Sequence, residues 1–227
     1  MQTVSKTFDA KDFKSLDLSN SGNYTLVQGK EYSVKATGRA MDLDRLDVGV
    51  NNGTLSMSEH SRNFCIFCFS GNPKIEITAP AFENITGHNS VEIGSDRIVA
   101  TTTTLTLENS SEAKIFYQTK SLTIDLRNSS DARLASTGTV DTLKATLSNS
   151  SGLNAINLLV NDADITTGNS SEAKVNVSGT LKYNSFNSSQ IYYVGNPILQ
   201  GNPEKYGNFP QPTTTSTLDA PFDIGTY

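Results

Sequence analysis

The chain of 227 residues is predicted to be an all-β protein, a right-handed parallel β-helix (solenoid) with coils of about 20 residues. The prediction rests on a short sequence motif that recurs along the chain. Two other observations support it. Apolar and polar residues alternate on both sides of each repeated motif, and 74 of the 227 residues are Asn, Ser or Thr, which are poor helix formers. The repeated motif is the tripeptide Asn-Ser-Ser, which starts at Asn109, Asn128, Asn149, Asn169 and Asn187.

Charge and hydropathy exclude two classes of protein. The chain has 18 basic and 23 acidic residues and a net charge of −5, with no basic block, which argues against a nucleic-acid partner. No stretch of sequence is apolar over the roughly 18 residues that a membrane-spanning helix needs. We therefore expect no nucleic-acid ligand and no membrane-spanning segment.

The Asn-Ser-Ser tripeptides recur at intervals of 19, 21, 20 and 18 residues. In the third copy, Leu143, Ala145 and Leu147 precede the motif at even offsets, and Leu153 and Ala155 follow it. Alternation with a period of two is typical of half-buried strands. Each repeat is therefore predicted to be a strand, an Asn-Ser-Ser corner and a second strand. Because Asn tolerates a left-handed backbone, it suits a sharp corner, and its side-chain amides can bond from coil to coil.

Less regular copies of the pattern occur upstream. We interpret the sequences around Asn20, Asn52 and Asn89 as further coils, which makes about eight units between residues 13 and 195. A propeller blade needs about 40 residues, twice this period, and the fixed Leu and Asn pattern of a leucine-rich repeat is missing. The parallel β-helix is the repeat architecture that fits the spacing.

Two segments resemble a known family. Residues 13–26 (FKSLDLSNSGNYTL) resemble its opening strand and corner, and residues 191–197 (IYYVGNP) are similar to its Tyr-x-Gly-x-Pro ending. The chain thus resembles the bacterial putative auto-transporter adhesin, head GIN domain family over residues 8–200, with Asn-Ser-Ser where that family usually has Gly-Ser-Gly. The resemblance implies a β-helical exported or cell-envelope protein. Residues 1–25 contain no signal-peptide hydrophobic region, so we expect that a leader peptide preceded Met1 and was removed.

A lone Cys-x-x-Cys motif, Cys65 and Cys68, lies in the most apolar run of the chain. A zinc ribbon needs a second pair of ligands, and a redox motif normally opens a helix, whereas Phe64 and Ile66 alternate as in a strand. Three interpretations of the two cysteines therefore stay open: structural thiols, a redox pair and a metal site. We favour structural thiols. The run interrupts the repeat, which predicts an insertion at residues 58–72 that packs against the coils or a second subunit.

Paired carboxylates raise the possibility of an enzyme, because many parallel β-helix proteins cleave polysaccharides. Asp162 and Asp164, and likewise Asp42 and Asp44, are predicted to lie on one strand face about 7 Å apart. No basic and aromatic cluster accompanies them, so we interpret them as surface acids. A polysaccharide-processing lyase or hydrolase is kept as the alternative function.

Outward positions of the repeat form regular polar rows. Three residues after each Asn lie Glu112, Asp131, Gly152 and Glu172, and two residues further on lie Lys114, Arg133, Asn154 and Lys174. We expect an acidic row beside a basic row, paired diagonally, although such exposed pairs stabilise a fold by only about 0–1 kcal/mol each. The resulting prediction is a non-enzymatic adhesin-like or scaffold protein whose polar rows bind a glycan or a matrix ligand.

No residue is assigned a catalytic, cofactor-binding or metal-binding role, and no cofactor is expected. The predicted domains are a single β-helical unit at residues 1–200 and a C-terminal arm or cap at 201–227, where Gly, Pro and Thr accumulate. The apolar end of that arm, residues 222–227, is expected to cover the open end of the solenoid, and a homo-oligomer is a candidate assembly.

Overall fold

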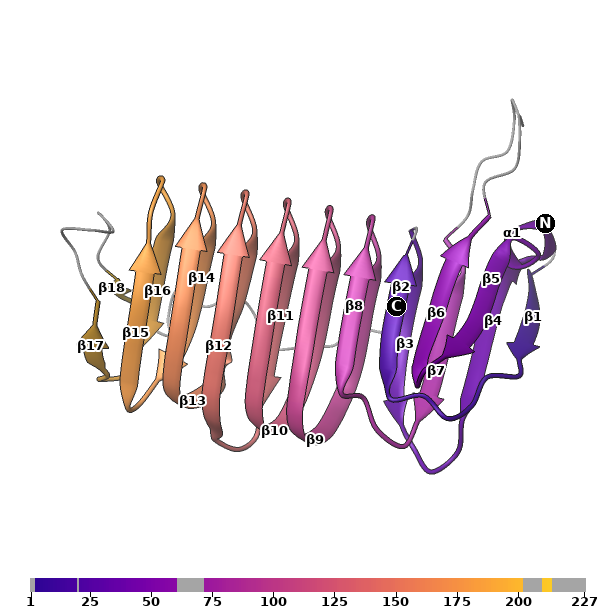
Figure 1. Ribbon diagram of the computed structural model, residues 1–227, viewed down its shortest axis with the longest axis horizontal. Coiled ribbons are helices and arrows are strands. Elements are labelled where there is room, and N and C mark those ends of the chain that lie inside the picture. Colours follow the sequence, from indigo (N-terminus) through magenta and orange to yellow (C-terminus); the bar gives the residue numbers. More distant parts are fainter. Residues whose placement is uncertain (1–2, 20, 61–71, 202–209, 214–227) are drawn as a thin grey trace.

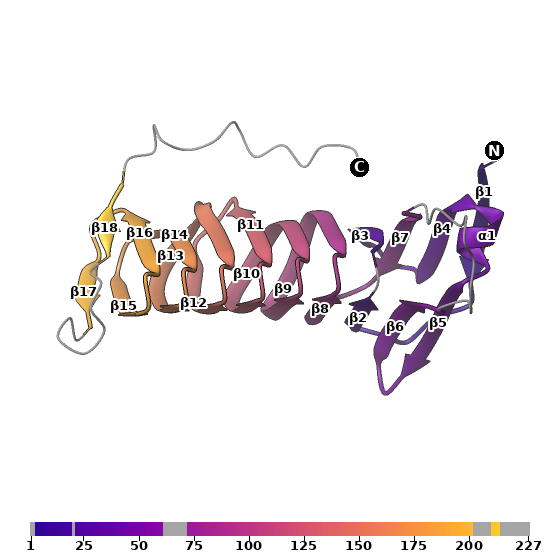
Figure 2. The same ribbon diagram turned by 90° about the horizontal axis from the view of Figure 1, so that it is seen from above.

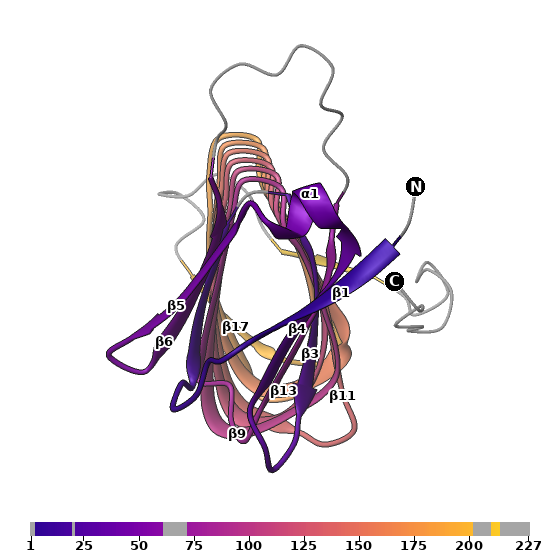
Figure 3. The same cartoon turned by 90° about the vertical axis from the view of Figure 1, so that its right-hand side faces the viewer.

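The computed structural model describes residues 3–19, 21–60, 72–201 and 210–213. It is 70% strand and 2% helix and forms a β-solenoid of about six turns. Figure 1 shows the turns side by side along the long axis, and Figure 3, viewed down that axis, shows two walls that enclose the core. The predicted parallel β-helix is confirmed.

Each coil consists of one strand that runs into an Asn-Ser corner and one strand that leaves it. We call the first set the leading wall and the second set the trailing wall. In spatial order, the leading wall contains β5 (Leu46–Asn51), β6 (Thr54–Glu59), β2 (Ser15–Ser19), β8 (Asn84–His88), β12 (Val140–Ser148), β15 (Thr180–Ser185) and β17 (Ile198–Gln200).

The trailing wall contains, in spatial order, β1 (Thr3–Phe8), β4 (Ser33–Arg39), β7 (Lys74–Ala79), β3 (Asn23–Gln28), β11 (Asp131–Ser136), β14 (Glu172–Val177), β16 (Gln190–Val194) and β18 (Gln211–Pro212). Three long strands belong to both walls, because each leaves one corner, bends round the opposite edge and runs into the next corner. They are β9 (Glu92–Glu108), β10 (Glu112–Arg127) and β13 (Gly152–Gly168).

The corners follow one plan from coil to coil and line up along the upper edge in Figure 1. Both the Asn and the first Ser have positive φ, for example 59° at Asn149 and 60° at Ser150. The backbone N–H of Ser150 donates to the carbonyl of Asn169 in the next coil over 2.9 Å. The second Ser of the motif is buried and bonds to the backbone. Ser151 is 2% exposed, and its hydroxyl donates to the carbonyl of Ser148.

The Asn side chains form the predicted ladder. Each Nδ2 donates to Oδ1 of the Asn one coil earlier, with distances of 2.9–3.0 Å from Asn109 back to Asn89 and onward through Asn128, Asn149, Asn169 and Asn187. The ladder links the exposed side-chain amides of successive coils to one another. All five Asn residues named from the repeat therefore lie on one edge.

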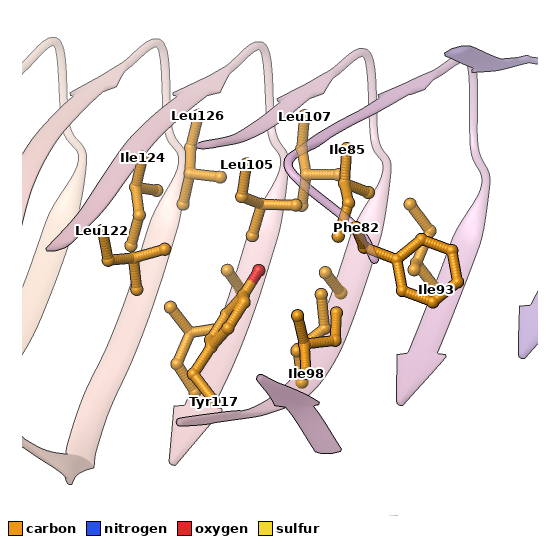
Figure 4. Packing of buried hydrophobic residues seen from close by; sticks show 14 of the residues in the cluster. Phe82, Ile85, Ile93, Ile98, Leu105, Leu107, Tyr117, Leu122, Ile124 and Leu126 are labelled. Atoms are coloured by element: carbon orange, nitrogen blue, oxygen red, sulfur yellow. The ribbon is translucent and has the colours of Figure 1, made fainter. Parts of the chain in front are cut away.

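The core consists of the apolar positions of both walls, stacked in register. Leu122, Ile124 and Leu126 of β10 pair with the corresponding apolar positions of β12, and Leu105 and Leu107 stack on them from β9. Figure 4 shows this packing together with Tyr117 from the trailing wall. Burying each such Leu or Ile stabilises the fold by about 1.5–3 kcal/mol, so the alternation itself drives coil stacking.

The N-terminal part departs from the repeat. β1 pairs with β4 and β4 with β7, both antiparallel, and β5 and β6 form an antiparallel hairpin seen at the right of Figure 2. The interpretation of Asn52 as a coil corner is wrong. Asn52 and Gly53 have φ of 49° and 74°, as in a two-residue hairpin turn, which Asn-Gly favours. The solenoid has about six turns, fewer than the eight units expected from the sequence.

The order of the coils along the solenoid differs from their order in the sequence at the N-terminal end. β6 and β7 pair with β2 and β3 on the side away from β8 and β9, so they form the coil that precedes β2–β3 in space although it follows in sequence. Residues 61–71, with Cys65 and Cys68, lie outside the described residues, and the insertion at 58–72 stays a prediction.

The placement of Asp42 and Asp44 on one strand face is also wrong. Asp42 lies in α1 (Ala40–Leu43), is 5% exposed and accepts hydrogen bonds from Nε and Nη2 of Arg39 over 2.6 and 2.9 Å. Asp44 follows the helix and pairs with Lys6. The domain boundaries at 200 and 201 stay a prediction, since residues 202–209 and 214–227 of the expected arm lie outside the described part.

Candidate ligand-binding grooves

A polar depression on the trailing wall follows the predicted rows. Strand register places Glu92, Glu112, Asp131, Gly152 and Glu172 in one row across successive coils. The second row, two residues further along each strand, is Gly94, Lys114, Arg133, Asn154 and Lys174. All of these residues except Gly94 line a depression of about 480 Å³, which we call the trailing groove.

The ion pairing in the trailing groove differs from the expected diagonal pattern at its far end. Nζ of Lys174 lies 3.0 Å from Oε1 of Glu172, two residues back on the same strand. Side chains two apart on a strand share one face, so this pairing needs no contact between coils. The two rows are confirmed as neighbours, and this pair lies along the strand.

Gly152 gives the trailing groove its shape. A Cβ atom at this position would collide with Oδ1 of Asp131, so the carboxylate lies over the glycine in space that a side chain would otherwise fill. Partial burial raises the pKa of Asp131, the carboxylate of Glu112 adds to the rise, and Arg133 opposes it. Because Gly152 has no side chain, the carboxylate of Asp131 can lie over it, and the groove remains open beside that carboxylate.

A second depression of about 550 Å³, here called the leading hollow, lies on the leading wall. It crosses the strands that run through β10, β12, β13 and β15, and its polar lining is Ser121, Thr142, Lys144, Asp162, Asp164, Thr180, Lys182 and Gln200. Asp162 and Asp164 do share strand β13, as predicted. Lys144 and Lys182 were not among the site residues predicted from the sequence. Each lies five residues before a corner Asn, as Asp164 does. This shared position in the repeat is the signal by which the sequence could have indicated that they lie together.

Asp162 has a structural role. Its Oδ1 accepts the backbone N–H of Thr180 over 2.8 Å, and its Oδ2 accepts Nδ2 of Asn161 over 2.9 Å. Among the described residues, the carboxylate of Asp164 has no hydrogen bond or ion pair. The side chain of Asp162 is thus held by two hydrogen bonds, whereas that of Asp164 is not.

Comparison with known proteins decides the family. A family model described as putative auto-transporter adhesin, head GIN domain, matches residues 12–197. The chain belongs to this family. The resemblance drawn from the opening and closing segments is confirmed. No curated protein sequence matches the chain.

Solved structures share the solenoid of this head GIN domain protein. A putative adhesin from Bacteroides fragilis superposes with a TM-score of 0.81 at 15% identity, covering 93% of this chain and 96% of that one. A putative adhesin from Parabacteroides distasonis gives 0.72 at 11% identity, covering 93% and 94%. A protein from the same species named a putative lipid binding protein gives 0.68 at 16% identity, covering 93% and 97%. At these identities the likeness shows the fold alone.

In the described part of the chain, no helix has the length and apolar character needed to cross a bilayer.

Proposed function

We propose that this head GIN domain protein is a non-enzymatic adhesin-like protein of the cell envelope or cell exterior that binds a glycan or a matrix protein through the trailing groove. The observation that carries the proposal is the pair of registered charged rows, Glu92 to Glu172 and Lys114 to Lys174, around the opening at Gly152. The family's description as an adhesin supports it.

The groove favours a hydrogen-bonding polymer as its ligand. Carboxylates accept hydrogen bonds and ammonium or guanidinium groups donate them, so adjacent rows can engage the hydroxyl, amide and charged groups of one ligand. Equivalent positions recur about every 4.8 Å along the solenoid. A ligand with its own repeat can therefore make the same contact at several coils, and weak contacts add up through multivalency.

The alternative function, a polysaccharide-processing enzyme, relies on Asp162 and Asp164. Hydrolysis by two carboxylates needs one acid free to donate a proton and the other free to attack or activate water. Both oxygens of Asp162 accept hydrogen bonds, one from the side chain of the adjacent Asn161 and one from the backbone N–H of Thr180 in β15. This arrangement favours binding over turnover.

The lipid-binding name of one structural neighbour leads to a third candidate, and the groove lining argues against it here. Lipid tails need an apolar cavity, whereas charged side chains dominate the trailing groove. We keep the glycan or matrix ligand as the proposal.

The test is an array of glycans and matrix proteins screened with the full chain, followed by titration of each hit. Gly152→Ala should displace the carboxylate of Asp131 and narrow the groove, which weakens binding about tenfold or more. Gly138→Ala is the control, because nothing lies within 4 Å of a Cβ atom there. Loss of binding in both variants, no binding on either array, or turnover abolished by Asp162→Asn would overturn the proposal.

A further inference from the structure

We propose that the leading hollow is a second binding site, specific for a linear acidic polysaccharide, with Lys144 and Lys182 holding its anionic groups. The hollow lies on the opposite wall from the trailing groove, so this site is independent of the proposed function.

The strand register sets the arrangement of charges. Lys144 of β12 pairs with Asp164 of β13, and Asp164 pairs with Lys182 of β15, so the two lysines flank the acid on successive coils. All three residues are exposed. In the part of the chain that the structure describes, none of the three side chains has a hydrogen bond or ion pair. The ammonium groups of Lys144 and Lys182 are thus available to a ligand, whereas Lys174 in the trailing groove is paired with Glu172.

Side-chain length separates the charges by depth. A lysine carries its ammonium on a four-carbon stem, and the aspartate carboxylate lies one carbon from the backbone. The ammonium groups can therefore extend farther from the sheet, towards the rim of the hollow, than Asp164 and the hydroxyls of Ser121, Thr142 and Thr180, which also line it and lie nearer its floor by side-chain length alone. The rim suits anions and the floor suits hydroxyl donors.

A sugar acid supplies both kinds of group in one residue. Its carboxylate or sulfate can pair with an ammonium, and its ring hydroxyls can donate to Asp164 or exchange hydrogen bonds with the floor hydroxyls. An inorganic anion would pair with the two lysines, but it would lie unfavourably close to the carboxylate of Asp164. The presence of Asp164 between the two cations thus selects for an anion that also carries hydroxyls.

The spacing specifies a polymer. Lys144 and Lys182 are two coils apart, which is about 10 Å along the solenoid. One negative charge per disaccharide of a linear polysaccharide matches that distance. Among the described residues, the lining of the hollow includes no aromatic side chain. Affinity therefore depends on charge and hydrogen bonds and should fall as salt screens the charges.

The chain's net charge of −5 makes a specific test feasible, because no general attraction draws acidic polymers to it. Binding of the full chain is measured by titration at low and high salt with three polymers: one carrying a carboxylate on alternate sugars, one carrying a sulfate on alternate sugars, and a neutral one. We expect binding to one or both acidic polymers and none to the neutral polymer. The carboxylate and sulfate arms identify which anion is preferred.

Matched variants locate the site. Lys144→Gln with Lys182→Gln should weaken binding about tenfold or more, since charged hydrogen bonds are lost. Lys11→Gln with Lys30→Gln removes the same charge from exposed positions elsewhere and should leave binding within about twofold. Gly152→Ala should also leave it unchanged. Equal binding of the neutral polymer, no binding of either acidic polymer, or an equal effect of the two lysine pairs would overturn the inference.

Discussion

Asn149 donates from Nδ2 to Oδ1 of Asn128 over 2.9 Å, while both residues hold left-handed backbones with φ of 59° and 57°. One residue type thus meets two requirements of the corner. A left-handed conformation costs most other residues about 1–2 kcal/mol, and the side-chain amide closes a hydrogen bond that runs from coil to coil. Asn169 donates to Asn149 in the same way.

The first prediction separates these two contributions. Asn149→Gly keeps the backbone conformation and loses two ladder bonds, each contributing about 0.5–1.5 kcal/mol. Asn149→Ala loses the bonds and adds the left-handed penalty, so it should destabilise by about 1–2 kcal/mol more than the glycine variant. Urea unfolding of both variants measures the difference. Equal stabilities would show that the ladder carries the whole effect.

Local periodicity explains why much of the fold could be predicted. The corner tripeptide and the apolar alternation lie within about 20 residues of each other, and stacking repeats the same contacts in each coil. The outward rows at Glu112 and Lys114 follow from that phase. The trailing groove does not, because it also depends on how Asp131 lies over Gly152.

The N-terminal errors have two different causes. Asn52 follows alternating apolar residues as a corner Asn does, and only the glycine after it indicates the hairpin turn. The position of β6 and β7 ahead of β2 and β3 in space is a long-range arrangement that no local pattern encodes. Asp42 lies in a short helix on the same non-repeating segment.

The second prediction concerns Tyr117, which is fully buried and whose hydroxyl has no hydrogen-bond partner among the described residues. A buried hydroxyl without a partner costs about 1–3 kcal/mol. Tyr117→Phe should therefore raise the free energy of unfolding, by about 1 kcal/mol. Thr103→Val tests the same reasoning at a second buried and unpartnered hydroxyl. Thermal unfolding of both variants is the measurement, and a clear loss of stability in Tyr117→Phe would contradict the argument.

The third prediction is a loss of stability in alkali. Burial raises the pKa of Tyr117 and of Tyr24 above the usual value near 10, and the carboxylate of Glu59 adds to the rise at Tyr24. The folded state therefore retains protons that the unfolded state releases, so stability falls as pH rises above about 10. Tyr117→Phe should reduce the slope by up to about 1.4 kcal/mol per pH unit. Unfolding in urea between pH 8 and 11 measures it, and an unchanged slope would contradict the prediction.

The fourth prediction concerns Asp131, whose carboxyl has a raised pKa from partial burial and from Glu112. A raised pKa means that the folded state disfavours the ionised form, so this carboxylate lowers stability at neutral pH and stops doing so below about pH 4, where it is protonated in both states. Asp131→Asn should accordingly raise the melting temperature at pH 7, and its advantage should disappear near pH 3.

Glu172→Gln is the matched control for Asp131→Asn, because it removes a carboxylate of the same row that is paired with Lys174. Its loss should lower stability by at most about 1 kcal/mol, since exposed pairs are weak. Melting curves of both variants at pH 7 and pH 3 give the comparison. A lower melting temperature for Asp131→Asn at pH 7 would contradict the prediction, because it would mean that the carboxylate of Asp131 gains more from Arg133 than it loses through burial and through Glu112.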